Sequence, residues 1–294
     1  MTPSALWQRL VVALLATLIV VLPPVAQARE TLIWLLRDLP PLSIFDGPEQ
    51  GQGAVDQMLP LLMERLPEYD HSILRVNRAR GMQMLNEPSF TCDPALLWTE
   101  ARAQKMLFSI RSMATTSNGL VVRQKDRALI EPFLLDGQLD LAALLQSNTL
   151  QLGIVAERSY GHPIDDVLSH TSESLLVRHY GNDALGSLLQ MQRIGRLKAL
   201  LGYWVEIRYQ ARQQQIDDND LAFYPIKGTA SYQFIRVACS NTPQGSAAIA
   251  HINEILLQLR KEQLVELYAR WLTPADQKKY REDAKSFFLT PDDQ

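Results

Sequence analysis

The spacing of apolar side chains predicts alternating strands and helices in the first part of the chain. Short apolar runs bounded by Gly, Pro or Asp indicate buried strands, and apolar residues every three or four positions indicate helices. These patterns predict extended segments at 31–36, 72–76, 91–97, 105–109 and 120–123, and helices at 56–66 and 79–85. Alternation of this kind is typical of an α/β domain with a largely parallel sheet.

A second unit of the same type follows. Its predicted strands lie at 150–155, 197–203, 221–226 and 234–238, and its helices at 139–145, 184–193 and 206–214, with a further helix beginning at 159–161. The tail predicts a long helical region over 246–272 with a break near Lys261, and a short polar helix over 274–288. The chain is therefore predicted to form two α/β units with helices at its C-terminal end.

The first 28 residues have the pattern of a secretory signal. Arg9 precedes an apolar run over residues 10–22, and the small residues Ala26 and Ala28 mark a cleavage site after residue 28. The alternative is an uncleaved membrane anchor, but the run is shorter than the roughly 20 residues that a spanning helix needs. No cysteine follows the cleavage site to carry a lipid. We therefore expect an exported, soluble protein.

Composition argues against nucleic acid as a partner. The 294 residues carry a formal charge of −3. Loss of Arg9 with the signal changes the charge from −3 to −4. Positive and negative side chains are scattered, without the basic block that binds phosphate backbones. The remaining length suits one large or two medium domains.

The sequence shows no constellation typical of an enzyme. The five histidines are His71, His162, His170, His179 and His251, and none has a close metal-ligand spacing. There is no glycine-flanked serine and no glycine-rich phosphate loop. Adjacent acids such as Asp165 and Asp166 are more typical of solvated turns than of an acid and base that face one substrate. We therefore predict a binding protein that has no catalytic residues, metal or cofactor; an enzyme on the same fold is the less favoured alternative.

The two cysteines leave two alternatives open. Cys92 and Cys239 are candidates for one disulfide, because an exported protein folds in an oxidising compartment. Cysteine is also tolerated as a small buried apolar residue, so two free thiols are equally compatible with the sequence.

The order of these parts resembles bacterial solute-binding proteins of family 3, which have the type II periplasmic binding fold and include polar amino-acid receptors. The matching motifs are spread over nearly the whole chain after residue 28, and their order is more specific than any one of them. They are Pro40, Pro41 and Leu42 with Asp46, Gly47, Gly53 and Asp56; Thr99, Glu100, Ala101 and Arg102 with Phe108 and Ser109; residues 119–123; residues 153–161; and Asn253, Leu256, Tyr268 and Trp271.

The resemblance implies two lobes that close around a small solute by a hinge. Lobe 1 would comprise residues 29–123 and 236–294, and lobe 2 residues 124–235. In this family the third strand and the returning strand lie side by side, which would bring Cys92 and Cys239 within disulfide range. The implied protein is a periplasmic monomer that delivers its solute to an inner-membrane ABC permease. Alternatively, it is a sensory module that docks on a membrane signalling protein.

The resemblance also implies an anionic or carboxylate-bearing solute. Arg102 matches the family's arginine, whose planar guanidinium binds a carboxylate through two parallel N–H groups; the alternative is a surface arginine. Thr99 belongs to the same motif. Ser159 matches a hydroxyl at a helix N-terminus, where free N–H groups favour an anion; the alternative is an ordinary N-cap.

Departures from the family pattern put an α-amino-acid ligand in doubt. Where the family has an aspartate for the ligand's amino group this chain has Tyr203, and the nearest acid, Glu206, remains a candidate ligand contact. Tyr203 and Trp98 could stack on a ring or a cation, although aromatic residues at strand ends are often part of the core. Phe45 and Tyr160 are weaker candidates of the same kind.

Overall fold

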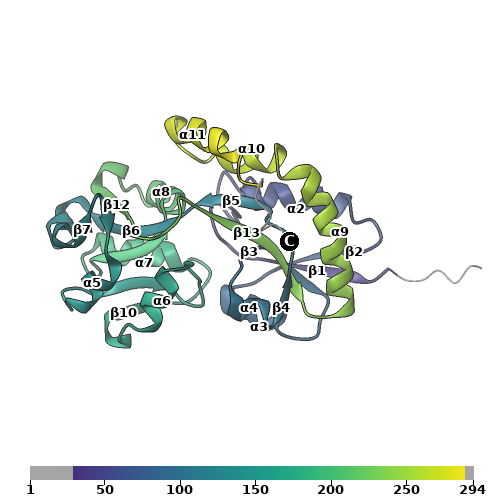
Figure 1. Cartoon of the computed structure of the whole chain (residues 1–294), viewed down its shortest axis with the longest axis horizontal. Helices are drawn as coiled ribbons and strands as arrows, with labels where there is room; N and C mark the ends of the chain where they lie inside the picture. The colour runs from purple at the N-terminus through teal and green to yellow at the C-terminus, as the bar shows by residue number, and fades with distance from the viewer. Residues whose placement is uncertain (1–28, 289–294) are drawn as a thin grey trace, which may run out of the picture.

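The structure is a computed structural model that describes residues 29–288, and the predicted signal at residues 1–28 lies outside them. Figure 1 shows two lobes side by side, joined by extended segments. Each lobe contains a sheet flanked by helices. The prediction of a two-lobed α/β architecture is confirmed.

Lobe 1 is built on a sheet with the order β2-β1-β3-β13-β4, and β5 also pairs with β13. Its strands are β1 (Thr31–Leu36), β2 (Asp70–Arg75), β3 (Thr91–Leu97), β4 (Met106–Phe108), β5 (Met113–Thr116) and β13 (Tyr232–Ser240). Its helices are α2 (Ala54–Glu64), α3 (Arg78–Leu85), α4 (Glu100–Ala103), α9 (Pro243–Leu259), α10 (Gln263–Ala269) and α11 (Pro274–Ala284). The break near Lys261 is confirmed, since it falls between α9 and α10.

Lobe 2 has a second sheet, with the order β10-β9-β11-β6-β12. Its strands are β6 (Asn118–Arg123), β9 (Leu152–Val155), β10 (Leu176–His179), β11 (Ala199–Tyr203) and β12 (Leu221–Pro225). Its helices are α5 (Leu141–Gln146), α6 (Ile164–Ser169), α7 (Ala184–Arg193) and α8 (Trp204–Gln213). Shorter elements are the hairpin β7 (Leu134–Leu135) and β8 (Gln138–Leu139), and the 3-10 turns η2 (Gln124–Leu129), η3 (Glu131–Phe133), η4 (Glu173–Leu175) and η5 (Asp218–Asp220).

Both sheets are mixed rather than parallel throughout. In lobe 1, β1 runs parallel to β2 and β3, whereas β13 runs antiparallel to all its neighbours. In lobe 2, β9 runs parallel to β10 and β11, whereas β6 is antiparallel to β11 and β12. The antiparallel strands are those that adjoin the two crossings between lobes, where the chain enters or leaves a sheet without a crossover helix.

The chain changes sheets at residue 117 and returns at residues 226–231. The boundaries expected from the sequence lay after residues 123 and 235. They assigned β6 to lobe 1 and the start of β13 to lobe 2, whereas each strand pairs in the sheet of the other lobe. Apolar periodicity marks an extended segment but does not say which sheet the segment joins.

Three local features differ from the sequence-based expectations. The helix expected at residues 159–161 begins only at Ile164, since the carboxylate of Asp165 accepts hydrogen bonds from the backbone N–H groups of Tyr160 and Gly161. The strands β5 and β10 had no counterpart in the predicted elements. Both have only four residues, too few for a clear alternating pattern.

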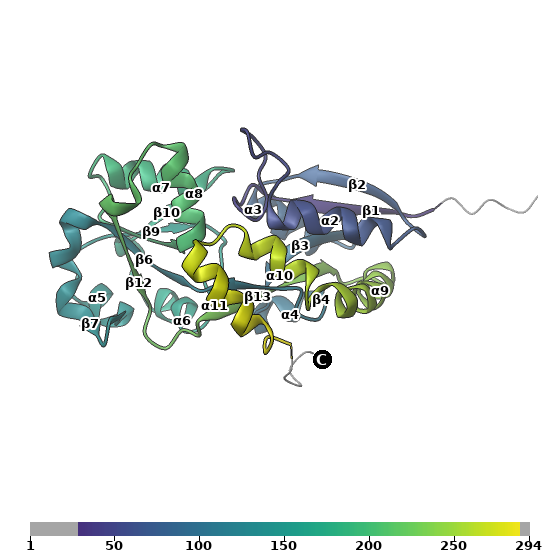
Figure 2. The ribbon, with the colours of Figure 1, turned by 90° about the horizontal axis from the view of Figure 1, so that it is seen from above.

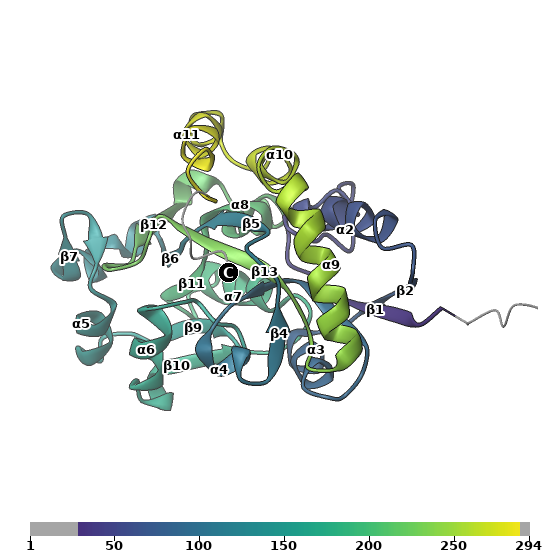
Figure 3. The ribbon, with the colours of Figure 1, turned by 45° about the vertical axis from the view of Figure 1, so that its right-hand side comes forward.

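The C-terminal helices brace the crossing strands (Figures 2 and 3). Tyr268 of α10 accepts a hydrogen bond at its hydroxyl from Thr116 N at 3.0 Å, and the Tyr280 hydroxyl of α11 donates to Ala114 O at 2.7 Å. Both tyrosine side chains are buried in the lobe 1 core. These contacts fix the lobe 1 end of the first crossing while residue 117 remains outside both sheets.

Cys92 and Cys239 form a disulfide. They lie opposite each other in the antiparallel pair β3 and β13, with 4.0 Å between their Cα atoms, and both are fully buried. The pairing that the family resemblance implied is confirmed. The bridge ties the outgoing part of lobe 1 to the strand that returns from lobe 2.

Candidate ligand-binding cleft

A cavity of ≈ 30 Å³ lies where the two lobes face each other. Lobe 1 lines it with the segment after β1 and the start of α3, and lobe 2 with the segment after β9, the turn before α7 and one face of α8. A water needs about 10–15 Å³ of such space, and a drug-sized ligand about 300–1,000 Å³. A solute as large as an amino acid therefore requires the lobes to move apart.

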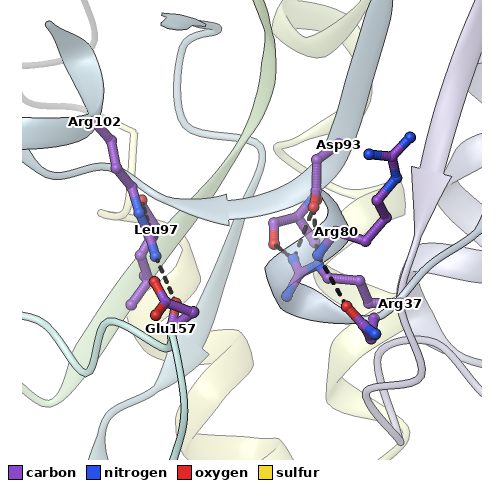
Figure 4. A network of polar contacts seen from close by, with 8 residues as sticks. Arg37, Arg80, Asp93, Leu97, Arg102 and Glu157 are labelled. Atoms are coloured by element: carbon purple, nitrogen blue, oxygen red, sulfur yellow. Dashed lines mark hydrogen bonds and ion pairs between the residues drawn. The ribbon is translucent and has the colours of Figure 1, made fainter. Parts of the chain in front are cut away.

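Arg37 lies in the lobe 1 wall of the cleft. Its Nε and Nη2 donate to the two carboxylate oxygens of Asp93 at 2.8 and 3.2 Å, and Nη2 also donates to Ala95 O at 2.6 Å (Figure 4). Arg37 and Asp93 are 8% and 2% exposed. The bidentate geometry neutralises a buried charge at the end of β1.

Arg102, the predicted carboxylate ligand, spans the two lobes. Its Nη1 donates to Leu97 O in lobe 1 at 2.9 Å, and its Nη2 donates to Glu157 O in lobe 2 at 3.4 Å (Figure 4). Thr99 caps α4 by accepting a hydrogen bond from Arg102 N at 3.3 Å. Burial and the nearby charge of Arg37 lower the pKa of Arg102. In this arrangement the guanidinium binds backbone carbonyls of both lobes.

The predicted anion site at Ser159 is occupied by a carboxylate of the chain itself. Asp165 accepts hydrogen bonds from the Ser159 hydroxyl, from Tyr160 N at 2.7 Å and from Gly161 N at 3.2 Å. Hydroxyl and backbone N–H donors of this kind would bind a solute carboxylate. In the structure these donors bind the carboxylate of Asp165, and the role of Ser159 in binding a solute stays a prediction.

Glu206, the other candidate acid, is paired with Arg158 of the same lobe. Arg158 Nη2 and Nη1 donate to the two Glu206 oxygens at 2.6 and 3.2 Å, and the side chains are only 3% and 5% exposed. Burial would lower the pKa of Arg158, but Glu206 and Tyr160 hold it above its ordinary value. The guanidinium also lies 4.9 Å from the ring centroid of Tyr203 and 5.5 Å from that of Tyr160.

The candidate aromatic residues do not form one stacking surface. Tyr203 and Phe45 are buried in the hydrophobic cluster of lobe 1, and Tyr160 in that of lobe 2. Trp98 is 51% exposed and does not line the cavity. Of the four, Tyr203 and Tyr160 lie beside the cleft through their contacts with Arg158.

Several cleft residues were not singled out by sequence reasoning. They are Arg37, Asp38, Arg78, Arg158, Asp183 and Gln210. Arg158 directly precedes the predicted Ser159, and this position was the one available signal. The others come from segments of no recognised motif.

Acidic groups from both lobes also face the cavity. Asp38 follows β1 and Asp183 precedes α7. Burial raises the pKa of Asp38 to about 6, with further contributions from Asp183, Asp46 and Asp56, while a hydrogen bond from Phe45 N opposes the rise. Burial also raises the pKa of Asp183. Bringing these carboxyls together is therefore easiest when Asp38 is protonated.

Comparison with known proteins identifies the fold. No family model matches the chain, and no curated protein sequence matches it. A histidine kinase sensor domain with similarity to periplasmic binding proteins matches with a TM-score of 0.64 and 16% identity, over 83% of this chain and 96% of that chain.

Two further solved structures have the same architecture. The substrate-binding protein of an ABC uptake transporter from Streptococcus pneumoniae, with bound histidine, has a TM-score of 0.62 and 13% identity, over 82% of this chain and 92% of that chain. The periplasmic VFT2 domain of Bordetella pertussis BvgS has a TM-score of 0.60 and 17% identity, over 83% and 94%. The chain therefore has the two-lobed, type II periplasmic binding protein fold.

Two features are absent from the described part of the chain. Within residues 29–288, no helix is both long and apolar enough to cross a membrane. No group of three His, Cys, Asp or Glu side chains in that range could hold a metal ion.

Proposed function

We propose that this protein is a periplasmic sensory module in which a small anionic solute changes how the two lobes meet. The carrying observation is that the expected anion-binding groups at Ser159 are bonded to Asp165, while the cavity that the preceding residue Arg158 lines measures only ≈ 30 Å³. A solute must then compete with a carboxylate of the chain and separate the lobes. The state of the cleft would be read by a membrane signalling protein.

Internal competition suits a sensor better than a scavenger. The apparent affinity of a solute falls in proportion to the fraction of molecules in the binding-competent state. Uptake at low solute concentration needs high affinity, whereas a sensor needs only a solute that binds one arrangement of the lobes better than the other. Because the Ser159 donors are already bonded to Asp165, the structure favours a sensor.

Uptake is the second candidate function, in which the protein would deliver its solute to an inner-membrane ABC permease. It is supported by the two short crossings at residues 117 and 226–231, which suit hinge closure, and by the similarity in fold to an ABC substrate-binding protein. Both proposals place a monomer in the periplasm after loss of residues 1–28, and neither includes a catalytic step.

In either role, the solute contacts that we propose are the polar groups of the cleft. Arg102, Thr99 and Ser159 would turn from their present partners to the solute as the lobes separate. Tyr203 and Glu206 would flank it from lobe 2.

Small-angle scattering of the purified protein tests this proposal. We expect organic acids, or another class in a panel with amino acids and polyamines, to change the radius of gyration and to raise the melting temperature. Identical scattering and melting with every solute would contradict a solute-driven change in the lobes.

The Asp165→Ala variant separates sensing from uptake, with Asp166→Ala as the matched control on the same helix. Asp166 is 66% exposed and pairs with His162, away from the anion site. If the wild type binds its solute weakly, and the affinity rises in Asp165→Ala but not in Asp166→Ala, the sensory function is supported. If the wild type binds its solute tightly and both variants bind it with the same affinity, uptake is supported. Such a result would also mean that Asp165 does not compete with the solute.

A further inference from the structure

Four arginines line or border the cleft, and they differ in their partners. Arg37, Arg102 and Arg158 are each bonded to protein oxygens, as described above. Arg78, the first residue of α3, has no hydrogen bond or ion pair with any residue in the range 29–288, although it lines the cleft cavity. Its guanidinium therefore stands out among the cleft cations.

A second donor without a partner lies in the same wall. Nη1 of Arg37 is buried and has no hydrogen-bond partner in the described part of the chain, whereas Nε and Nη2 of that guanidinium are bonded. Arg37 is 8% exposed, so its Nη1 has little access to bulk water. Arg37 and Arg78 both line the cleft cavity.

The acid beside these arginines does not act as their counterion. Asp38 also lines the cavity, but its pKa is raised by burial and by other acids, and no arginine is among the causes. A carboxylate paired with a guanidinium would have its pKa lowered instead. Burial lowers the pKa of Arg78, the charges of Arg37, Arg158 and Arg102 lower it further, and Asp93 opposes the fall.

We propose that Arg78, together with Nη1 of Arg37, binds a compact oxyanion. This inference rests on the proposed function, since the oxyanion would be the charged end of the solute that the cleft recognises. Two guanidiniums present planar N–H groups that match the oxygens of a carboxylate, phosphate or sulfate group. A cation that is partly withdrawn from water and has no counterion is costly, and an anion at this place offsets that cost.

The Arg78 site would add a recognition group outside the family motif. Arg102 is used to join Leu97 of lobe 1 to Glu157 of lobe 2, so it contributes to the contact between lobes. Arg78 has no such task. An anionic group of the solute would therefore bind at the start of α3, on the lobe 1 side of the cleft, in addition to the contacts proposed at Ser159 in lobe 2.

Calorimetric titration of the purified full-length protein with sodium acetate, sodium phosphate or sodium sulfate tests the site. Sodium chloride keeps the ionic strength constant, because exposed charges are screened by salt. We expect at least one oxyanion to bind the wild type, and Arg78→Gln to weaken this binding about tenfold or more, as expected for loss of a charge-assisted hydrogen bond. The three anions distinguish carboxylate from phosphate and sulfate chemistry.

Arg80→Gln is the matched control, because Arg80 lies on the same helix and its side chain is 51% exposed. It should leave binding within about twofold of the wild type, since an exposed charge contributes little. Arg78→Lys keeps the charge without the planar fork, and we expect an intermediate affinity. This second variant also keeps the test decisive if Arg78→Gln does not fold.

Each outcome separates this inference from the proposed function. Absence of oxyanion binding, or equal affinities in the wild type, Arg78→Gln and Arg78→Lys, would overturn the Arg78 site even if scattering shows that another solute moves the lobes. Binding that depends on Arg78 but leaves the radius of gyration unchanged would support the site and count against solute-driven movement.

Discussion

Substitution of Glu206 by Gln tests whether the cleft is closed in solution. The Glu206 carboxylate holds the Arg158 guanidinium through two hydrogen bonds of 2.6 and 3.2 Å, and both side chains are almost wholly buried. Both residues belong to lobe 2, but they line the cavity that lobe 1 covers. Their burial therefore depends on the approach of the two lobes.

The structure sets the expected size of the effect. Removal of one partner from a buried ion pair costs roughly 3–5 kcal/mol, since it leaves an uncompensated buried charge. An exposed pair is worth only about 0–1 kcal/mol. A change of 1 kcal/mol shifts the melting temperature by about 2–4 °C for a domain of 150–250 residues, so Glu206→Gln should lower it by roughly 6–20 °C.

Thermal and urea unfolding of Glu206→Gln and of a matched variant, Glu173→Gln, give the measurement. Glu173 forms a bidentate pair with Arg178 in the same lobe, at 2.8 and 2.9 Å, but Glu173 is 73% exposed. This control should unfold as the wild type does. Equally small effects in both variants would refute the reasoning, because they would mean that water reaches Arg158 and that the lobes stand apart.

Three further predictions concern the disulfide, the cleft residue Asp38, and Asp165. Reduction of the Cys92–Cys239 bridge should lower the free energy of unfolding by about 5 kcal/mol, because the two cysteines are 147 residues apart and the unfolded chain regains the freedom of a long loop. Urea unfolding with and without dithiothreitol measures this loss, and unchanged stability would contradict it. The raised pKa of Asp38, about 6, means that the folded protein binds this proton more tightly than the unfolded chain, so stability is lost as pH rises through 6. Asp38→Asn should therefore stabilise the protein at pH 7.5 by about 1 kcal/mol, discounted for partial exposure, and have no effect at pH 4; equal effects at both pH values would exclude this cause. Asp165→Ala should lose about 2–3 kcal/mol of stability, because three hydrogen bonds to this carboxylate are removed. Acetate should then raise the melting temperature of the variant more than that of the wild type. Equal shifts in the two proteins would show that the freed donors at Ser159 do not bind carboxylates.

The general fold could be predicted from the sequence because it depends on patterns that repeat along the chain. Strands such as β1 and β9 are nearly continuous apolar runs, and the C-terminal helices show clear helical spacing. The crossing strands were harder, since β6 and β13 continue directly from one lobe towards the other. Their sheet membership depends on pairing partners far away in sequence, which periodicity does not report.

The bonds of the candidate site could be predicted only in part. The motif located Arg102 next to its cap Thr99, but not the backbone oxygen of Glu157 that it reaches across the cleft. Asp165 and Asp166 look alike as adjacent acids. In a helix successive side chains point about 100° apart, and only Asp165 faces the loop before α6.

The same limit explains why the ligand-recognition group that we propose lies outside the motif. A motif fixes where a side chain is placed in the fold, whereas its use depends on the charges that other segments bring to it. Arg102 and Arg158 are bonded to oxygens from elsewhere in the chain, and so are Nε and Nη2 of Arg37. Arg78 gains no such partner in the described residues, although it faces the same cavity. Because charge-assisted hydrogen bonds offset the cost of withdrawing a cation from water, an incoming anion stabilises Arg78 more than Arg102, whose guanidinium is already bonded to two carbonyl oxygens.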